Sequence, residues 1–167
     1  TDYEYRVAHA NYITQYGSGD NINLFVFNAS TVLNVLRKIT DHMLKVDAVK
    51  EIIEDNDIPT VIFTWYKDHA QTIQRALGTN NAVLITGDTD SVLRQKDALW
   101  AQQHNKHICA TIASLTECVN LSGYRQVIYF EEVYAPGANY QSLSRIVRDR
   151  NDAGLSTEPV IVHYVHA

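Results

Sequence analysis

The stretch TVIFT at Thr60–Thr64 is a short run of β-branched and aromatic residues, a composition typical of a β-strand that is covered on both faces. Four more short, mostly apolar runs follow it, at residues 82–86 (AVLIT), 107–111 (HICAT), 126–130 (QVIYF) and 160–165 (VIVHYV). Their length and composition predict four further strands.

Helical patterns separate these runs. Ala70, Ile73 and Leu77 recur at helical spacing after the first run, and Gly78 is expected to end that helix. The next connection carries Val92, Leu93, Leu99 and Trp100 among charged residues, which predicts an amphipathic helix. Strands that alternate with helices are the signature of crossover connections around a parallel sheet. The sequence therefore predicts an α/β domain, a three-layer α/β/α sandwich with a mainly parallel central sheet.

Further helical patterns precede the first run. Apolar residues recur at helical spacing over residues 32–39 and again over residues 46–53, and residues 3–16 are a third candidate. We expect residues 1–55 to form a helical lead-in that packs on the core of residues 56–167, giving one structural domain overall.

Composition narrows the class of protein. The chain is 46% hydrophobic, but no apolar run approaches the length of about 20 residues that a membrane helix needs. A soluble protein without a membrane partner is expected, in the cytoplasm or, in a eukaryote, the nucleus. The net charge of -5 argues against a protein that coats nucleic acid through bulk electrostatics.

The most informative residues follow the fourth predicted strand. If Asn139 caps a helix there, then Gln141, Arg145 and Arg148, at i, i+4 and i+7, share one stripe of it. Arginine suits the charge that develops on a transferring phosphoryl group, because its planar fork is permanently charged and binds oxygens in pairs. The competing interpretation is a solvated helix face whose arginines pair with nearby acidic residues.

The pattern Q-x-x-x-R-x-x-R in the last helix of a five-strand α/β domain resembles helicase motif VI. Other segments resemble further helicase motifs in the matching order: residues 61–69 (VIFTWYKDH), 85–89 (ITGDT) with Arg94, 111–121 (TIASLTECVNL), 130–136 (FEEVYAP), and the lead-in 35–39 (VLRKI) with Lys45. The chain thus resembles the second RecA-like domain of a superfamily-two helicase or translocase of the Swi/Snf type. Its glycine-poor motif V, with Leu115, Thr116 and Cys118, points to a divergent branch such as a viral or phage member.

The resemblance implies a role for each motif. Arg145 and Arg148 would be catalytic, contacting the γ-phosphate of ATP, and Gln141, Asn120 and Glu117 would lie at the ATP-binding cleft between two domains. Contacts to a DNA or RNA backbone are implied for Thr64, Trp65, Gly87, Thr111 and Ser114. Trp65 could also pack against the following helix rather than stack on bases.

The nucleotide cradle is missing from this sequence, since no G-x-x-x-x-G-K-[ST] pattern occurs. ATP and Mg²⁺ would therefore be bound mainly by a preceding RecA-like domain of the same polypeptide, and the fragment alone is expected to be inactive. Two rivals remain: a non-catalytic binding module that keeps the fold, and an unrelated doubly wound enzyme.

Other candidate sites are weaker. His104, His107 and Cys109 lie close in sequence, but their spacing does not suit zinc, and no metal site is expected. Glu131 and Glu132 are adjacent on an extended segment, so one should face the cleft edge and the other solvent, in either order.

Overall fold

The computed structural model describes residues 44–115, 119–131, 136–152, 154 and 159–165. The chain divides into two units, residues 1–44 with residue 167, and residues 45–166, and the described residues belong almost entirely to the second. The helical patterns expected at 3–16 and 32–39 lie outside the described residues. The predicted division between a lead-in and a core stays a prediction.

Five strands form one parallel sheet in the order β2-β3-β1-β4-β5. Their bounds are β1 Thr60–Thr64, β2 Ala82–Ile85, β3 His107–Thr111, β4 Gln126–Tyr129 and β5 Ile161–Tyr164. The five predicted strands are confirmed, with ends that differ by one residue at most. β1 lies at the centre, where Val61 is opposite Ile108 of β3 and Val127 of β4.

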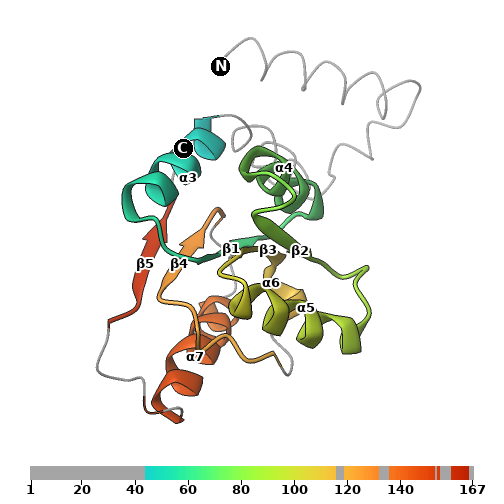
Figure 1. The fold of residues 1–167 in the computed structure, drawn as a ribbon, viewed down its shortest axis with the longest axis vertical. Coiled ribbons are helices and arrows are strands. Elements are labelled where there is room, and N and C mark those ends of the chain that lie inside the picture. Colours follow the sequence, from blue (N-terminus) through green and yellow to red (C-terminus); the bar gives the residue numbers. More distant parts are fainter. Residues whose placement is uncertain (1–43, 116–118, 132–135, 153, 155–158, 166–167) are drawn as a thin grey trace, which may run out of the picture. The chain divides into compact units, whose positions relative to one another are not determined.

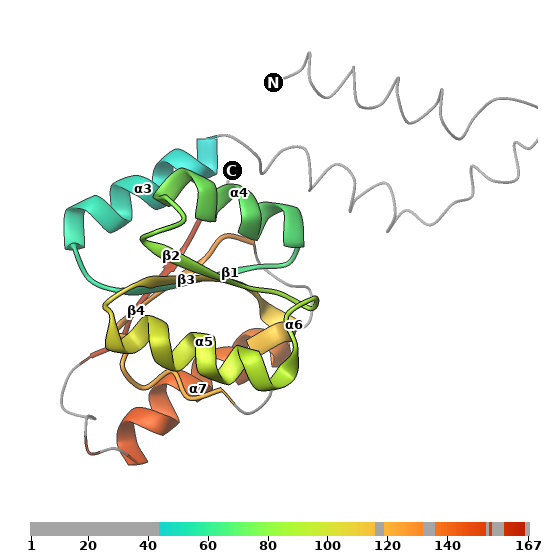
Figure 2. The same ribbon diagram turned by 45° about the vertical axis from the view of Figure 1, so that its right-hand side comes forward.

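Helices cover both faces of the sheet, which confirms the three-layer sandwich (Figure 1 and Figure 2). One face carries α3 (Leu44–Asn56) and α4 (Lys67–Leu77), and the other carries α5 (Ser91–Gln103), α6 (Ile112–Leu115) and α7 (Pro136–Asp152). The helices predicted after the first, second and fourth strands are α4, α5 and α7.

Successive strand residues point to opposite faces, so the sheet builds two apolar cores. On β1, Ile62 packs with the buried residues of α3 and α4, whereas Val61 and Phe63 pack with those of α5, α6 and α7. Phe63 also begins an aromatic stack that crosses three strands. Its ring centroid lies 5.4 Å from that of Tyr129, which lies 5.2 Å from that of Tyr164.

The ends of two helices follow from single residues. α4 stops at Gly78, as predicted, whose φ of 90° is a backbone conformation that favours glycine. α7 begins at Pro136, so the prediction that Asn139 caps it is wrong. Proline suits the first turn of a helix, because its φ is already helical and its missing N–H would have no partner there.

The packed face of α5 differs from the amphipathic pattern in the sequence. Val92, Leu93, Leu99 and Trp100 are between 48% and 62% exposed, and the side chains that pack on the sheet are those of Ala98 and Ala101. α5 contacts β2, the edge strand, and its neighbour β3. Its packed face is made of small residues, and its larger apolar side chains lie outside that face.

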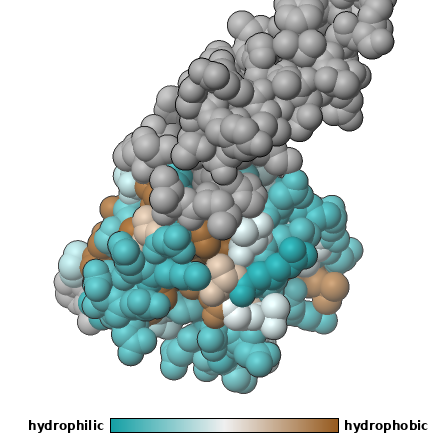
Figure 3. All heavy atoms as spheres, turned by 90° about the horizontal axis from the view of Figure 1, so that it is seen from above, coloured by the Kyte–Doolittle hydropathy of each residue, from teal (hydrophilic) through white to brown (hydrophobic). Residues whose placement is uncertain are grey.

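The surface is mixed in character. Seen from the side of α3 and α4, the visible surface of the described residues is mostly hydrophilic, with smaller hydrophobic areas between (Figure 3). Within the ranges that the structure describes, no helix combines the length and apolar character needed to cross a membrane.

Candidate functional site at the carboxyl edge of the sheet

Several of the predicted nucleic-acid residues meet where the parallel strands end. Thr64 and Thr111, the last residues of β1 and β3, lie opposite each other in the sheet. Ser114 follows in α6, and its hydroxyl donates to carbonyl oxygens of Ile85 and Thr111, at 2.9 and 2.7 Å. The structure therefore brings Thr64, Thr111 and Ser114 to one edge.

The hydroxyl groups at this edge serve the fold. Thr64 donates from Oγ1 to the carbonyl oxygen of Tyr66 at 2.9 Å, and both Thr64 and Ser114 are buried. A phosphate contact from either hydroxyl would require it to give up an internal hydrogen bond. Whether these residues touch nucleic acid stays a prediction.

The loop after β2 is held by Arg94. Its guanidinium donates from Nε to the Thr89 carbonyl at 2.8 Å and from Nη2 to the Gly87 carbonyl at 3.2 Å. Nη1 also lies 3.4 Å from the Ser114 carbonyl oxygen, which ties this loop to α6. Gly87 itself is exposed, and a Cβ there would meet nothing within 4 Å. Gly87 thus lies on an accessible loop whose backbone is held by hydrogen bonds from Arg94.

The loop after β1 is held from the neighbouring strand. Glu131, which follows β4, accepts a hydrogen bond from the backbone N–H of Trp65 through Oε2, and its Oε1 contacts Nδ1 of His69. The side chains of Glu131 and His69 are buried, whereas Trp65 is 46% exposed. The inward-facing member of the Glu131–Glu132 pair is therefore Glu131, and Glu132 lies outside the described residues.

An ion pair links two of these loops on the outside. Nζ of Lys67, the first residue of α4, pairs with Oδ2 of Asp88 in the loop after β2. Both side chains are largely exposed, so this pair is worth little stability on its own. The ion pair shows, however, that the start of α4 and the loop after β2 lie next to each other.

Helix α7 is fixed to the end of β4 by Tyr129. Its hydroxyl oxygen lies 2.7 Å from that of Ser142, and the two hydroxyls lie 3.0 and 2.8 Å from the carbonyl oxygen of Asn139. Burial raises the pKa of Tyr129 to about 12, an effect that the bond to Ser142 opposes. The hydroxyl thus remains protonated and able to donate in the ordinary pH range.

The predicted catalytic residues lie on α7. Ser142 and Ile146 are buried on the face toward the sheet, Gln141 is exposed, and Arg145 is partly buried on the flank between. Arg148 lies on α7 three residues after Arg145, and its side chain is outside the described part. The structure therefore places Gln141 and Arg145 on one flank of the helix, as the spacing predicts.

The other two predicted cleft residues are Glu117 and Asn120. Glu117 lies outside the described residues. Asn120 is held near the far end of α5, where its carbonyl oxygen accepts from Nε2 of Gln102 at 2.8 Å. Its position near the cleft stays a prediction.

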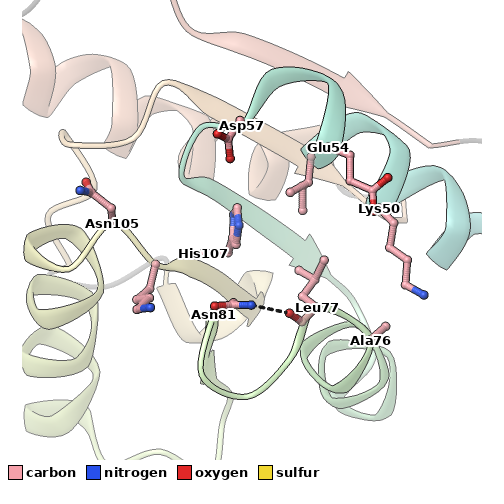
Figure 4. A pocket seen from close by; sticks show the side chains of 10 residues that line it. Lys50, Glu54, Asp57, Ala76, Leu77, Asn81, Asn105 and His107 are labelled. Atoms are coloured by element: carbon pink, nitrogen blue, oxygen red, sulfur yellow. Dashed lines mark hydrogen bonds between the residues drawn. The ribbon is translucent and has the colours of Figure 1, made fainter.

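A hollow lies at the opposite, amino edge of the sheet (Figure 4). It has a volume of about 510 Å³, and polar residues such as Lys50, Glu54, Asp57 and His107 line it. Nδ1 of His107 accepts the backbone N–H of Thr60 at 3.2 Å. Burial lowers the pKa of His107; Asp57 opposes this shift and Lys106 adds to it. None of the predicted motor residues that the structure describes lines this hollow.

The three residues considered for zinc do not converge. His104 stacks on Trp100 with ring centroids 4.4 Å apart, and His107 binds the backbone of β1 as described above. Cys109 belongs to the core beneath α3 and α4, where burial raises its thiol pKa far above the usual range. Among the described residues, no group of three His, Cys, Asp or Glu side chains could hold a metal ion.

No model of a protein family matches the sequence, and no curated protein sequence matches it. Solved structures do share its fold. The C-terminal part of the Fun30 ATPase domain has a TM-score of 0.61 and 21% identity, over 72% of this chain and 40% of that one. A Dbp5 variant from S. cerevisiae, bound to RNA and ADP BeF3, has a TM-score of 0.57 and 16% identity over 74% of this chain and 32% of its own.

A hypothetical ATP-dependent RNA helicase from Sulfolobus tokodaii has a TM-score of 0.57 and 17% identity, over 75% of this chain and 34% of its own. The chain therefore spans well under half the length of each of these three solved chains. At this level of identity the similarity establishes architecture. The chain has the α/β fold of the RecA-like domains found in helicases.

Proposed function

We propose that this chain is the second motor domain of an ATP-dependent helicase or translocase, which closes on a preceding RecA-like domain around ATP. One observation carries the proposal. Trp65 and Gly87, both exposed, lie at the same sheet edge to which Tyr129 fixes the helix that bears Gln141 and Arg145. A Swi/Snf-type motor from a divergent viral or phage branch, working in the cytoplasm or nucleus, fits the sequence motifs.

Nucleic acid would lie along the loops at the carboxyl ends of the strands. Trp65 offers an exposed ring for stacking on a base, and Gly87 offers backbone that a phosphate can approach without meeting a side chain. Thr64, Thr111 and Ser114 would act beneath them, mainly by holding those loops. Such contacts grip a DNA or RNA backbone without reading its sequence.

ATP would be sensed from α7. Arg145 and Arg148 would stabilise the charge that develops on the γ-phosphate, and Gln141 would help to position them. Mg²⁺ and most of the nucleotide would be held by the preceding domain. The chain alone would then turn over no ATP.

The alternative is a non-catalytic module that binds nucleic acid or protein and keeps only the fold. The net charge of -5 favours the protein-binding form of this module, because phosphate backbones attract basic surfaces. The two proposals differ in whether the arginines of α7 matter for turnover.

The deciding experiment measures nucleic-acid-stimulated ATP turnover of the longer polypeptide that contains this chain. Arg148→Ala and Arg145→Ala should lower kcat by about 10³-fold or more, with little change in ATP affinity, and lysine should not restore it fully. Arg75→Ala, an exposed arginine on the other face of the sheet, is the matched control and should leave kcat unchanged. Normal turnover in both α7 variants would support the non-catalytic module.

A further inference from the structure

The loop that presents Trp65 leads directly into the N-terminus of α4. α4 begins after Tyr66, and no side chain of this N-cap residue satisfies the first N–H groups of the helix. Helix N-termini usually obtain an acceptor from a residue at or just before the first turn. α4 has one acidic residue of its own in the first turn, Asp68, and a second acidic side chain reaches this region from another strand. Glu131 binds the N–H of Trp65, the residue before the N-cap, and also contacts His69 in the first turn.

Burial makes this arrangement specific. The side-chain exposures of His69 and Glu131 are 1% and 0%, and a buried carboxylate is costly unless its oxygens are bound. Each Glu131 oxygen has one of these two partners, and the start of α4 adds a favourable helix dipole. Releasing either partner would leave part of a buried charge uncompensated, so the two contacts are expected to hold or fail together.

The surroundings hold Glu131 in place. The ring of His69 lies edge-on to that of Phe130, with centroids 5.6 Å apart, and the carbonyl oxygen of Phe130 accepts from Nζ of Lys45 at 3.2 Å. The N–H of Phe130 donates to the carbonyl oxygen of Phe63 at 2.9 Å, which continues the pairing of β4 with β1. The end of β4 and the loop after β1 are therefore joined by several contacts around Glu131.

We propose that Glu131 is a positioning residue that fixes the exposed ring of Trp65 for nucleic-acid contact by tying that loop to the end of β4. This rests on the proposed function and deepens it. A base stacked on Trp65 bears on a loop whose backbone is bound to the residue that follows β4. Glu131 therefore acts through Trp65 and touches no ligand itself.

The first test needs no nucleic acid. Hydrogen exchange at the Trp65 amide, followed by NMR on the full chain, should become roughly tenfold faster in Glu131→Ala, because the amide loses its acceptor. Glu131→Gln keeps an oxygen for Trp65 N–H and should retain most of the protection. Ile73→Val, which loosens the buried side of α4 without touching Glu131, is the control for general destabilisation and should leave this amide as it is.

Should Glu131→Ala fail to fold, hydrogen exchange at the Trp65 amide is measured in Glu131→Asp instead. Its carboxylate is one carbon shorter and cannot reach both partners, so faster exchange is again expected. An unchanged Trp65 amide in Glu131→Ala or Glu131→Asp, or an equal change in Ile73→Val, overturns the proposal.

The second test uses a single-stranded oligothymidine. Glu131→Ala should weaken its binding by up to about tenfold, the order of one stacked base, and Glu131→Gln should restore most of the affinity. If the unmodified chain binds no oligonucleotide, the proposed function fails, whatever the amide shows. If it binds and Glu131→Ala binds equally well, the positioning role fails while the proposed function stands.

Discussion

The hydroxyl oxygens of Tyr129 and Ser142 lie 2.7 Å apart, inside the protein, at the point where the last strand pair meets the helix that carries Arg145. Tyr129 is stacked between Phe63 and Tyr164, so its ring cannot turn away. The orientation of α7 about its own axis is therefore set by a tyrosine whose position three strands determine.

Tyr129→Phe should test whether the Tyr129–Ser142 hydrogen bond positions α7. The ring stack survives and a buried hydrogen bond is lost, at a cost of about 1 kcal/mol of unfolding free energy. In the longer polypeptide, kcat for ATP should fall because Arg145 and Arg148 are less well placed. Tyr124→Phe is the matched control, since it removes another largely buried hydroxyl, one that donates to the Lys106 carbonyl at 2.9 Å. Equal turnover in the two variants would reduce Tyr129 to a structural role.

Trp65 and Trp100 form a second matched pair. They are 46% and 48% exposed, but only Trp65 lies at the carboxyl edge of the sheet. Trp65→Ala should weaken binding of a single-stranded oligonucleotide by about tenfold, and Trp100→Ala should not. The affinity should also fall with salt, by a slope of about -0.7 per phosphate contact on a single strand. A strong preference for one base sequence would contradict a backbone grip.

His107 predicts a pH dependence of stability. Its folded-state pKa is lowered, so the unfolded chain binds a proton more readily, and stability is lost as the pH falls below about 6.5, the ordinary pKa of histidine. Protonation would also remove Nδ1 as the acceptor for Thr60 N–H. Urea unfolding between neutral and mildly acidic pH should show a smaller loss in His107→Gln than in the unmodified chain. His104→Gln, in which an exposed histidine is replaced, should behave like the unmodified chain.

The sequence predicts the strands well because their composition is nearly unambiguous. Doubly covered strands such as TVIFT must be apolar throughout, and here no competing helical pattern overlaps them. The helix faces are harder. Leu99 and Trp100 form an apolar stripe that periodicity assigns to the core, yet the position of α5 at the sheet edge leaves them exposed. Periodicity identifies an apolar face of a helix, but it does not show whether another element packs against that face.

The site is predicted in part for a similar reason. The order of the motifs leads to Trp65, Gly87 and the stripe on α7, because each follows a strand that ends at the same edge. Arg94 appears in that pattern as a motif residue, but nothing local shows that it binds the backbone of two loops. The contact of Glu131 with Trp65 joins residues 66 positions apart and has no local signature. An acidic residue directly after an apolar strand was its one visible sign.

The topology around β1 has a consequence for where a ligand can sit. The chain leaves β1 toward α4 on one face and leaves the adjacent β4 toward α7 on the other, so the connections part between the two strands. Doubly wound proteins commonly bind their ligands in the crevice that such a divergence opens. In this chain Glu131 spans that gap and closes it with a buried bond to Trp65. A ligand would therefore bind on the outer surface of this sheet edge rather than in a crevice between β1 and β4. On that surface a second domain could contact the same ligand.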